Sequence, residues 1–168
     1  MECDVCGSHN VLQRTIEQRL VEECQLCGHL QGDDDAVRAI EELQDGRERG
    51  FDDTVIPLVH ALESTEVFRV VRASPAPGAR RESPQVLFRL DKGETAYLEH
   101  LMRAIEFSNR TTKRRWIVEL SLQHELLYVL KPRFMKPPTE VTPTEIEQAC
   151  ADLPRLARSL RRDLGRGL

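Results

Sequence analysis

The sequence predicts an α+β protein in which a small cysteine-rich unit precedes a largely antiparallel sheet of about four strands packed with helices. Two Cys-x-x-Cys turns lie within the first 28 residues, which indicates a separate N-terminal unit. Farther along, paired runs of β-favouring residues alternate with stretches whose apolar residues recur at helical spacing. We therefore expect three parts: the N-terminal unit at residues 1–32, a helical connector at 33–66 and an α+β domain at 67–168.

The two cysteine turns read CDVCG at residues 3–7 and CQLCG at residues 24–28. Zinc prefers four ligands in a tetrahedron, and a Cys-x-x-Cys turn supplies two sulfurs from one short loop. Glycine after each second cysteine lets the loop adopt positive φ. The chain between the turns is long enough for two short strands, near residues 11–16 and 20–24, with a turn about residues 17–18.

This arrangement resembles the zinc ribbon, in which two cysteine turns at the ends of a β-hairpin share one ion. The resemblance covers about residues 1–31, and the remainder of the chain resembles no family that we recognise. It implies one structural Zn²⁺ ion without an open coordination position, because four thiolates complete the tetrahedron. The ligands would be Cys3, Cys6, Cys24 and Cys27.

Other uses of the cysteines are less favoured. An iron centre of the rubredoxin type has similar ligands, but no aromatic residue precedes Phe51 to shield one. Thiol redox chemistry in the manner of thioredoxin is a further alternative. His9 and His29 lie close enough in sequence to replace a ligand, and we interpret them as solvent-facing or as donors to a sulfur.

Charge is distributed unevenly along the chain. Residues 1–66 carry 16 acidic and 5 basic side chains, a net charge of −11, whereas residues 67–168 carry 12 acidic and 19 basic ones, a net charge of +7. Many zinc ribbons bind nucleic acid, but contact with phosphate needs a surplus of Lys and Arg. The acidic surplus around the cysteines favours a structural or protein-binding role for the ribbon.

The connector is predicted to contain two helices. The three aspartates at 33–35 favour a helix start, and Val37, Ile40 and Leu43 follow at helical spacing. This helix should end near Gly46 to Gly50. A second helix should begin around Asp53 or Thr54, with Pro57 in its first turn.

The α+β domain should begin with strands at residues 67–73 and 85–90, separated by a loop rich in proline and glycine. A helix follows at 94–109, where an apolar stripe recurs at helical spacing. Thr142 begins the last helix, because a proline and the acid of a capping box follow it. Pro154 should kink or divide that helix.

Between these helices, residues 113–136 contain two β-favouring runs around Gln123 and His124, which predicts a hairpin. If these two residues form the tip, or the centre of a four-residue loop, Trp116 shares the core side with Leu127 and Val129. A three-residue loop would shift this register.

The predicted register gathers basic residues at the open end of the hairpin, with Arg114 opposite Arg133 and Trp116 opposite Lys131. Basic side chains beside aromatic ones can hold phosphates and stack on bases, so single-stranded RNA or DNA is a candidate ligand. The alternative is that these charges are solvated or pair with the acidic first half. The candidate contact residues are Arg110, Lys113, Arg114, Arg115, Trp116, Lys131, Arg133 and Lys136.

No catalytic motif stands out, so an enzyme is the least favoured class and no catalytic residue is assigned. The chain has no apolar run of roughly 18 to 20 residues and no N-terminal signal pattern, so we expect a cytoplasmic protein without a membrane partner. The leading hypothesis is a zinc-stabilised interaction or regulatory adaptor that binds another protein through its α+β domain. A nucleic-acid-binding protein that uses the basic hairpin end is the alternative. The oligomeric state is not indicated.

Overall fold

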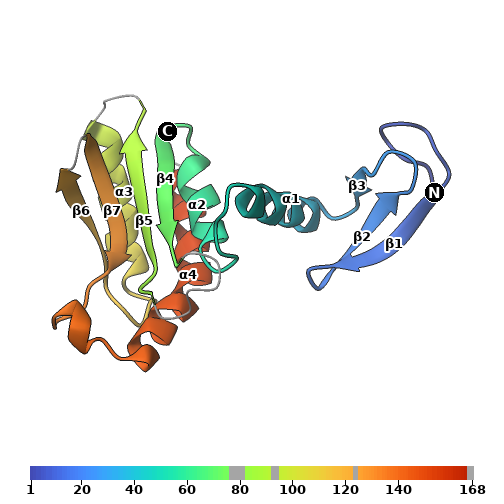
Figure 1. The fold of residues 1–168 in the computed structure, drawn as a ribbon. Coiled ribbons are helices and arrows are strands. Elements are labelled where there is room, and N and C mark those ends of the chain that lie inside the picture. The colour runs from blue at the N-terminus through green and yellow to red at the C-terminus, as the bar shows by residue number, and fades with distance from the viewer. Residues whose placement is uncertain (76–81, 92–94, 123–124, 166–168) are drawn as a thin grey trace. The chain divides into compact units, whose positions relative to one another are not determined.

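The chain forms two compact units, Met1–Asp45 and Gly46–Leu168. The computed structural model describes residues 1–75, 82–91, 95–122 and 125–165 (Figure 1). Helices and antiparallel sheets occur together, so the predicted α+β class is confirmed. Within the described ranges, no helix is both long enough and apolar enough to cross a membrane.

The N-terminal unit is built on a β-hairpin. β1 (Val11–Ile16) and β2 (Arg19–Cys24) pair antiparallel, and β3 (Leu30–Gln31) adds to β2. Glu17 and Gln18 join the first two strands with φ of 49° and 64°, the left-handed conformation that a two-residue hairpin turn of type I′ requires. The first residue of β1 pairs with the last of β2, so the two cysteine turns flank the same end of the hairpin.

α1 (Asp34–Glu48) follows the hairpin, and the boundary between the units falls within it. The carboxylate of Asp33 accepts a hydrogen bond of 2.8 Å from the backbone N–H of Ala36, which satisfies a donor in the first turn. Val21, Ala36 and Ile40 form the small buried cluster of this unit. That cluster is modest, so the hairpin and helix have little apolar burial to hold them together.

The C-terminal unit contains a four-stranded antiparallel sheet in the order β4-β5-β7-β6. Its strands are β4 (Phe68–Ser74), β5 (Gln85–Leu90), β6 (Trp116–Leu122) and β7 (Leu126–Pro132). Its helical elements are α2 (Ile56–Glu63), α3 (Thr95–Ser108), the short 3₁₀ helix η1 (Pro138–Glu140) and α4 (Pro143–Leu164). The strand order leaves β4 and β6 at the two edges of the sheet.

The core of this unit lies between the sheet and its three α-helices (Figure 1). The sheet contributes Phe88, Trp116 and Leu130, and the helices contribute large side chains that include Leu58, Leu62, Leu101, Leu153, Leu156 and Leu160. α2, which the sequence placed in a connector, therefore packs as part of the core. Buried β-branched and aromatic residues on one face of each strand explain why the sheet forms here.

The register of the β6–β7 hairpin differs from the predicted one by one residue. Ile117, and not Trp116, lies opposite Lys131, and the backbone N–H of Arg133 donates to the carbonyl of Arg115 at 2.7 Å. The connection between the strands is three residues long, and the predicted tip at 123–124 lies outside the described residues.

The observed register changes which side chains face the core. Trp116 shares its face with Tyr128 and Leu130, and not with the predicted Leu127 and Val129. The predicted pairing of Arg114 with Arg133 was wrong for the same reason. The observed arrangement is favoured because it places Leu130, which is fully buried, on the side that the helices cover.

The predicted capping box of α4 is present. The hydroxyl of Thr142 accepts a hydrogen bond from the Glu145 N–H at 3.4 Å, and the Glu145 carboxylate accepts one from the Thr142 N–H at 2.9 Å. Pro154 was predicted to kink or divide this helix. It lies inside α4, which continues past it undivided. Its side chain is exposed, so the pyrrolidine ring faces solvent and not the core.

Candidate metal centre and basic hairpin end

The four predicted cysteine ligands meet at one place. Cys3 and Cys6 lie in the turn before β1, Cys24 is the last residue of β2, and Cys27 lies in the turn after it. All four Sγ atoms lie within 4.8 Å of one another. Two pairs of Sγ atoms lie closer together: those of Cys3 and Cys27 are 3.7 Å apart, and those of Cys6 and Cys24 are 3.5 Å apart.

These distances fit a tetrahedral ion. With metal–sulfur bonds of about 2.3 Å, two sulfurs at adjacent corners of a tetrahedron are separated by about 3.8 Å. The two short sulfur–sulfur distances of 3.5 and 3.7 Å come close to that value. The four thiolates could therefore hold one metal ion, and their number would complete a tetrahedral coordination shell. Neither His9 nor His29 belongs to the cluster that could hold the ion.

The backbone repeats the same turn at both cysteine pairs. The N–H of Gly7 donates to the carbonyl of Cys3 at 2.9 Å, and the N–H of Gly28 donates to that of Cys24 at 2.8 Å. Both glycines have positive φ, 69° and 75°, as the sequence predicts. The N–H of each first cysteine also donates across its turn, to the carbonyls of Ser8 and His29. The sulfurs are thus positioned by hydrogen-bonded backbone and not by apolar packing.

The thiols differ in acidity before any ion binds. The backbone N–H of Cys27 lowers the pKa of Cys24 to about 6, because it stabilises the thiolate. At Cys6 the N–H of Ser8 acts in the same direction, but desolvation and the neighbouring cysteines outweigh it and raise the pKa to about 12. Four sulfurs this close cannot all carry a negative charge unless a cation lies between them. The arrangement is suited to a divalent ion.

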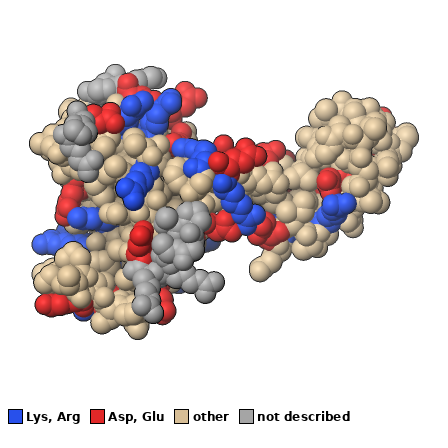
Figure 2. All heavy atoms as spheres, in the orientation of Figure 1, with Lys and Arg blue, Asp and Glu red and all other residues tan. Residues whose placement is uncertain are grey.

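The predicted basic cluster is largely paired with carboxylates. Arg114 lies 3.6 Å from Glu145 and donates to Gln148 at 2.7 Å, while Lys136 pairs with the same glutamate. Arg115 pairs with Glu106 at 3.3 Å. Lys131 pairs with Glu119 of the adjacent strand. These partners lie within the C-terminal unit and not in the acidic first half of the chain. Lys and Arg side chains lie interspersed with Asp and Glu over the visible surface of this unit (Figure 2).

Three of the predicted contact residues have no carboxylate partner among the described residues: Arg110, Lys113 and Arg133. Arg110 lies over the ring of Phe107, 5.2 Å from its centroid. Trp116, in contrast, is only 1% exposed, so its ring offers no face for a base to stack on. The exposed aromatic surface near the cluster comes from Phe107, which is 49% exposed, and from Phe134, which is partly exposed and lies beneath the guanidinium of Arg114.

Part of the cluster lines a groove of about 560 Å³ at the end of β6 and β7. Ile117, Pro132 and Phe134 provide apolar surface, and Lys131 and Arg133 lie among them. Ligand sites commonly combine a mostly apolar lining with a few polar groups. The segment before β5 and the segment after β7 complete the groove, and the carboxylates of Glu82 and Glu119 also line it. The course of the segment after β7 is not revealed by the sequence.

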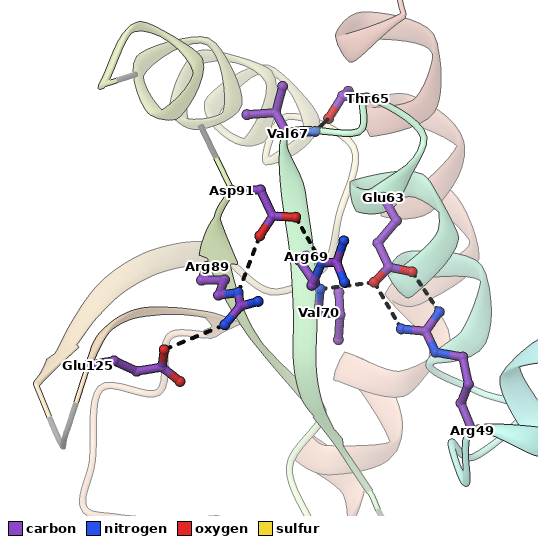
Figure 3. A network of polar contacts seen from close by, with 9 residues as sticks. All are labelled: Arg49, Glu63, Thr65, Val67, Arg69, Val70, Arg89, Asp91 and Glu125. Atoms are coloured by element: carbon purple, nitrogen blue, oxygen red, sulfur yellow. Dashed lines mark hydrogen bonds and ion pairs between the residues drawn. The ribbon is translucent and has the colours of Figure 1, made fainter. Parts of the chain in front are cut away.

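A second polar network, which the sequence analysis missed, lies along β4 and β5 (Figure 3). The guanidinium of Arg49 donates to both carboxylate oxygens of Glu63, at 2.7 and 2.9 Å. Asp91 accepts from Arg69 at 2.8 Å and from Arg89 at 3.2 Å. Each of these three arginines has a carboxylate partner, and because the pairs are partly exposed they add little net stability. No sequence spacing marks it, because its members come from separate elements.

Comparison of the chain with protein-family models, curated proteins and solved structures finds no match.

Proposed function

We propose that the protein is a non-enzymatic adaptor in which an N-terminal zinc ribbon holds one structural Zn²⁺ ion and the α+β unit binds another protein. The four-thiol cluster is the observation that supports the metal assignment, since all four sulfurs lie within 4.8 Å. Zinc is favoured because tetrahedral all-sulfur sites select zinc or iron, and zinc needs no redox chemistry. The closed ligand set favours a structural ion over a catalytic one.

The groove beside β7 is the proposed recognition surface of the adaptor. It combines apolar surface at Ile117 and Phe134 with the exposed cation of Arg133, which has no carboxylate partner in the described part of the chain. Such a surface suits a protein segment with an apolar and an acidic side chain.

Affinity purification of the zinc-loaded chain from native extract tests this function. A protein partner should be recovered with the wild type and lost with Arg133→Glu, which reverses the charge in the groove. Arg158→Glu is the matched control, because Arg158 is an exposed arginine on α4 that also lacks a carboxylate partner among the described residues. Equal recovery with both variants would contradict the proposal.

Binding of single-stranded nucleic acid through the basic hairpin end is the alternative. Arg110, Lys113 and Arg133 favour it, since no described carboxylate neutralises them, while the burial of Trp116 counts against it. Such binding should weaken steeply as salt rises and should fall when Arg114, Lys131 and Arg133 are changed to Ala. Absence of binding to RNA and DNA oligonucleotides at low salt would exclude it.

A further inference from the structure

The two edges of the C-terminal sheet differ in their protection against pairing with another strand. At β4, the Glu63 carboxylate accepts a hydrogen bond of 2.9 Å from the backbone N–H of Val70 (Figure 3). The β4–β5 register then shifts between Val70 and Arg72, and Pro75 follows the strand directly. Blocked donors, bulges and prolines are common means of preventing edge-to-edge association.

Beyond Trp116, β6 has none of these features in the described residues. It pairs with β7 in continuous register from Trp116 to Leu122, and it contains no proline, lysine or arginine. Exposed edges of this kind present unpaired backbone groups to other chains.

Asn109 shows which backbone groups of β6 point outward. The N–H of Trp116 donates to Oδ1 of Asn109 at 2.7 Å, and its carbonyl accepts from Nδ2 of the same side chain at 2.9 Å. Both groups therefore point away from β7. Because the pattern alternates along an antiparallel strand, the backbone groups of Val118, Leu120 and Leu122 also point to the open edge. Asn109 is the one residue in the described ranges that bonds to this edge.

Apolar side chains accompany these free backbone groups. The side chains of Leu120 and Leu122 are 56% and 74% exposed, and Leu126, directly opposite Leu122 on β7, is 51% exposed. All three share one face of the sheet, since they occupy even positions like Trp116. An edge with free donors, free acceptors and exposed leucines is suited to accept another strand.

We propose that β6 pairs antiparallel with β6 of a second copy of this chain, about a twofold axis at Leu120. The two leucines at position 120 would then face each other, and Val118 would face Leu122 of the second copy. Glu119 would lie opposite Ser121, a hydroxyl donor, so no like charges meet. This pairing is independent of the proposed adaptor function, which requires no second copy.

The two registers shifted toward Trp116 are less favourable. An axis at Glu119 would place two carboxylates opposite each other, which destabilises a strand pair. An axis at Val118 would require Leu120 to pair with Trp116, whose backbone groups are already bonded to Asn109. The strand thus complements itself better about Leu120 than about Glu119 or Val118, whereas no feature of the edge specifies the sequence of a foreign peptide.

Sedimentation of the metal-loaded full chain over a range of concentrations tests the pairing. The wild type should show a monomer–dimer equilibrium. Leu120→Pro removes an outward-facing donor while leaving the β6–β7 ladder intact, so it should raise the dimer dissociation constant at least about tenfold. Leu120→Lys should act similarly by placing a charge on the axis. Val71→Lys is the matched control on β4, where an apolar side chain is also 46% exposed, and it should leave the constant unchanged.

Circular dichroism of each variant establishes that the sheet is retained, and Leu120→Lys decides the matter if the proline variant unfolds. A wild-type chain that stays monomeric at every concentration would overturn the proposal. So would a dimer that both Leu120 variants leave intact, because the interface would then lie elsewhere.

Discussion

The N-terminal unit buries a cluster of only three apolar side chains, Val21, Ala36 and Ile40, whereas the C-terminal unit packs four strands against three α-helices around one core. The first unit compensates with four thiols within 4.8 Å of one another. Units of about 40 residues often need a metal or disulfides, because they bury too little surface. Metal dependence should therefore be confined to the N-terminal unit of this chain.

Removal of the metal should have the largest effect and should reach one unit alone. Chelation of the zinc-loaded protein should unfold the β1–β2 hairpin, since structural zinc contributes about 10–16 kcal/mol of apparent binding free energy in small domains. Amide NMR spectra should lose the dispersed signals of the hairpin while those of the C-terminal sheet persist. Cys150→Ser is the control, because this thiol lies outside the cluster. If the hairpin kept all its dispersed amide signals without metal, the N-terminal unit would not depend on the metal for its fold.

Trp116→Ala should produce the opposite pattern. The indole is 1% exposed in the core, so its loss should cost about 3–5 kcal/mol of unfolding free energy through the cavity left behind. Urea denaturation followed by circular dichroism measures the loss, and elemental analysis should find the same metal content as in the wild type. Trp116→Phe should cost less because it keeps an aromatic ring in the core. An unchanged denaturation midpoint for the alanine variant would contradict the assignment of Trp116 to the core.

Asp152→Ala should destabilise the C-terminal unit by about 2–3 kcal/mol, because a buried carboxylate that binds two donors would be lost. Asp152 is 2% exposed and accepts hydrogen bonds from the backbone N–H groups of Lys113 and Arg114, at 2.9 and 2.8 Å. Denaturant titration gives the change, and Glu147→Ala, at an exposed acid on the same helix, is the control. Equal losses of unfolding free energy for the two substitutions would mean that the hydrogen bonds from Asp152 to the loop before β6 do not contribute to stability.

The smallest effect is expected at Glu145. Its partner Lys136 and the backbone N–H of Thr142 lower the pKa of this carboxyl from 4.5 to about 2. A depressed pKa means that the contribution to stability is present above the unfolded value and is lost as pH falls from about 4.5 toward 2. Thermal unfolding at pH 7 should therefore show a lower midpoint for Glu145→Gln than for the wild type. The two midpoints should converge near pH 2, and a constant difference would contradict this role.

Local signals in the sequence predicted much of the fold. The cysteine spacing located all four sulfurs of the cluster, and the Thr142 capping box marked the start of α4, because these features depend on neighbouring residues. The register of the β6–β7 hairpin was not predictable in the same way. The register shifts when the connecting loop is longer or shorter by one residue. Burial of Leu130 against the helices favours the observed register over the predicted one.

The surroundings of the basic residues also lay beyond sequence patterns. Arg114 and Lys136 share Glu145 as a partner. Arg114 lies in the loop before β6, Lys136 lies in the loop after β7, and Glu145 lies in α4. Charge runs indicate where cations are common, but ion pairs between distant elements depend on the tertiary fold. The sequence could therefore name candidate contact residues without showing that many of them are neutralised by nearby carboxylates.

The side chain of Asn109 has a consequence for solvent exchange along β6. In the monomer, the N–H of Ile117, Glu119 and Ser121 faces β7 and should exchange slowly with deuterium, whereas the N–H of Val118, Leu120 and Leu122 faces outward and should exchange fast. The N–H of Trp116 also faces outward, but it donates a hydrogen bond to the Asn109 side chain, which should slow its exchange. A period-two exchange pattern with one slow exception would thus mark, residue by residue, how far this edge is open.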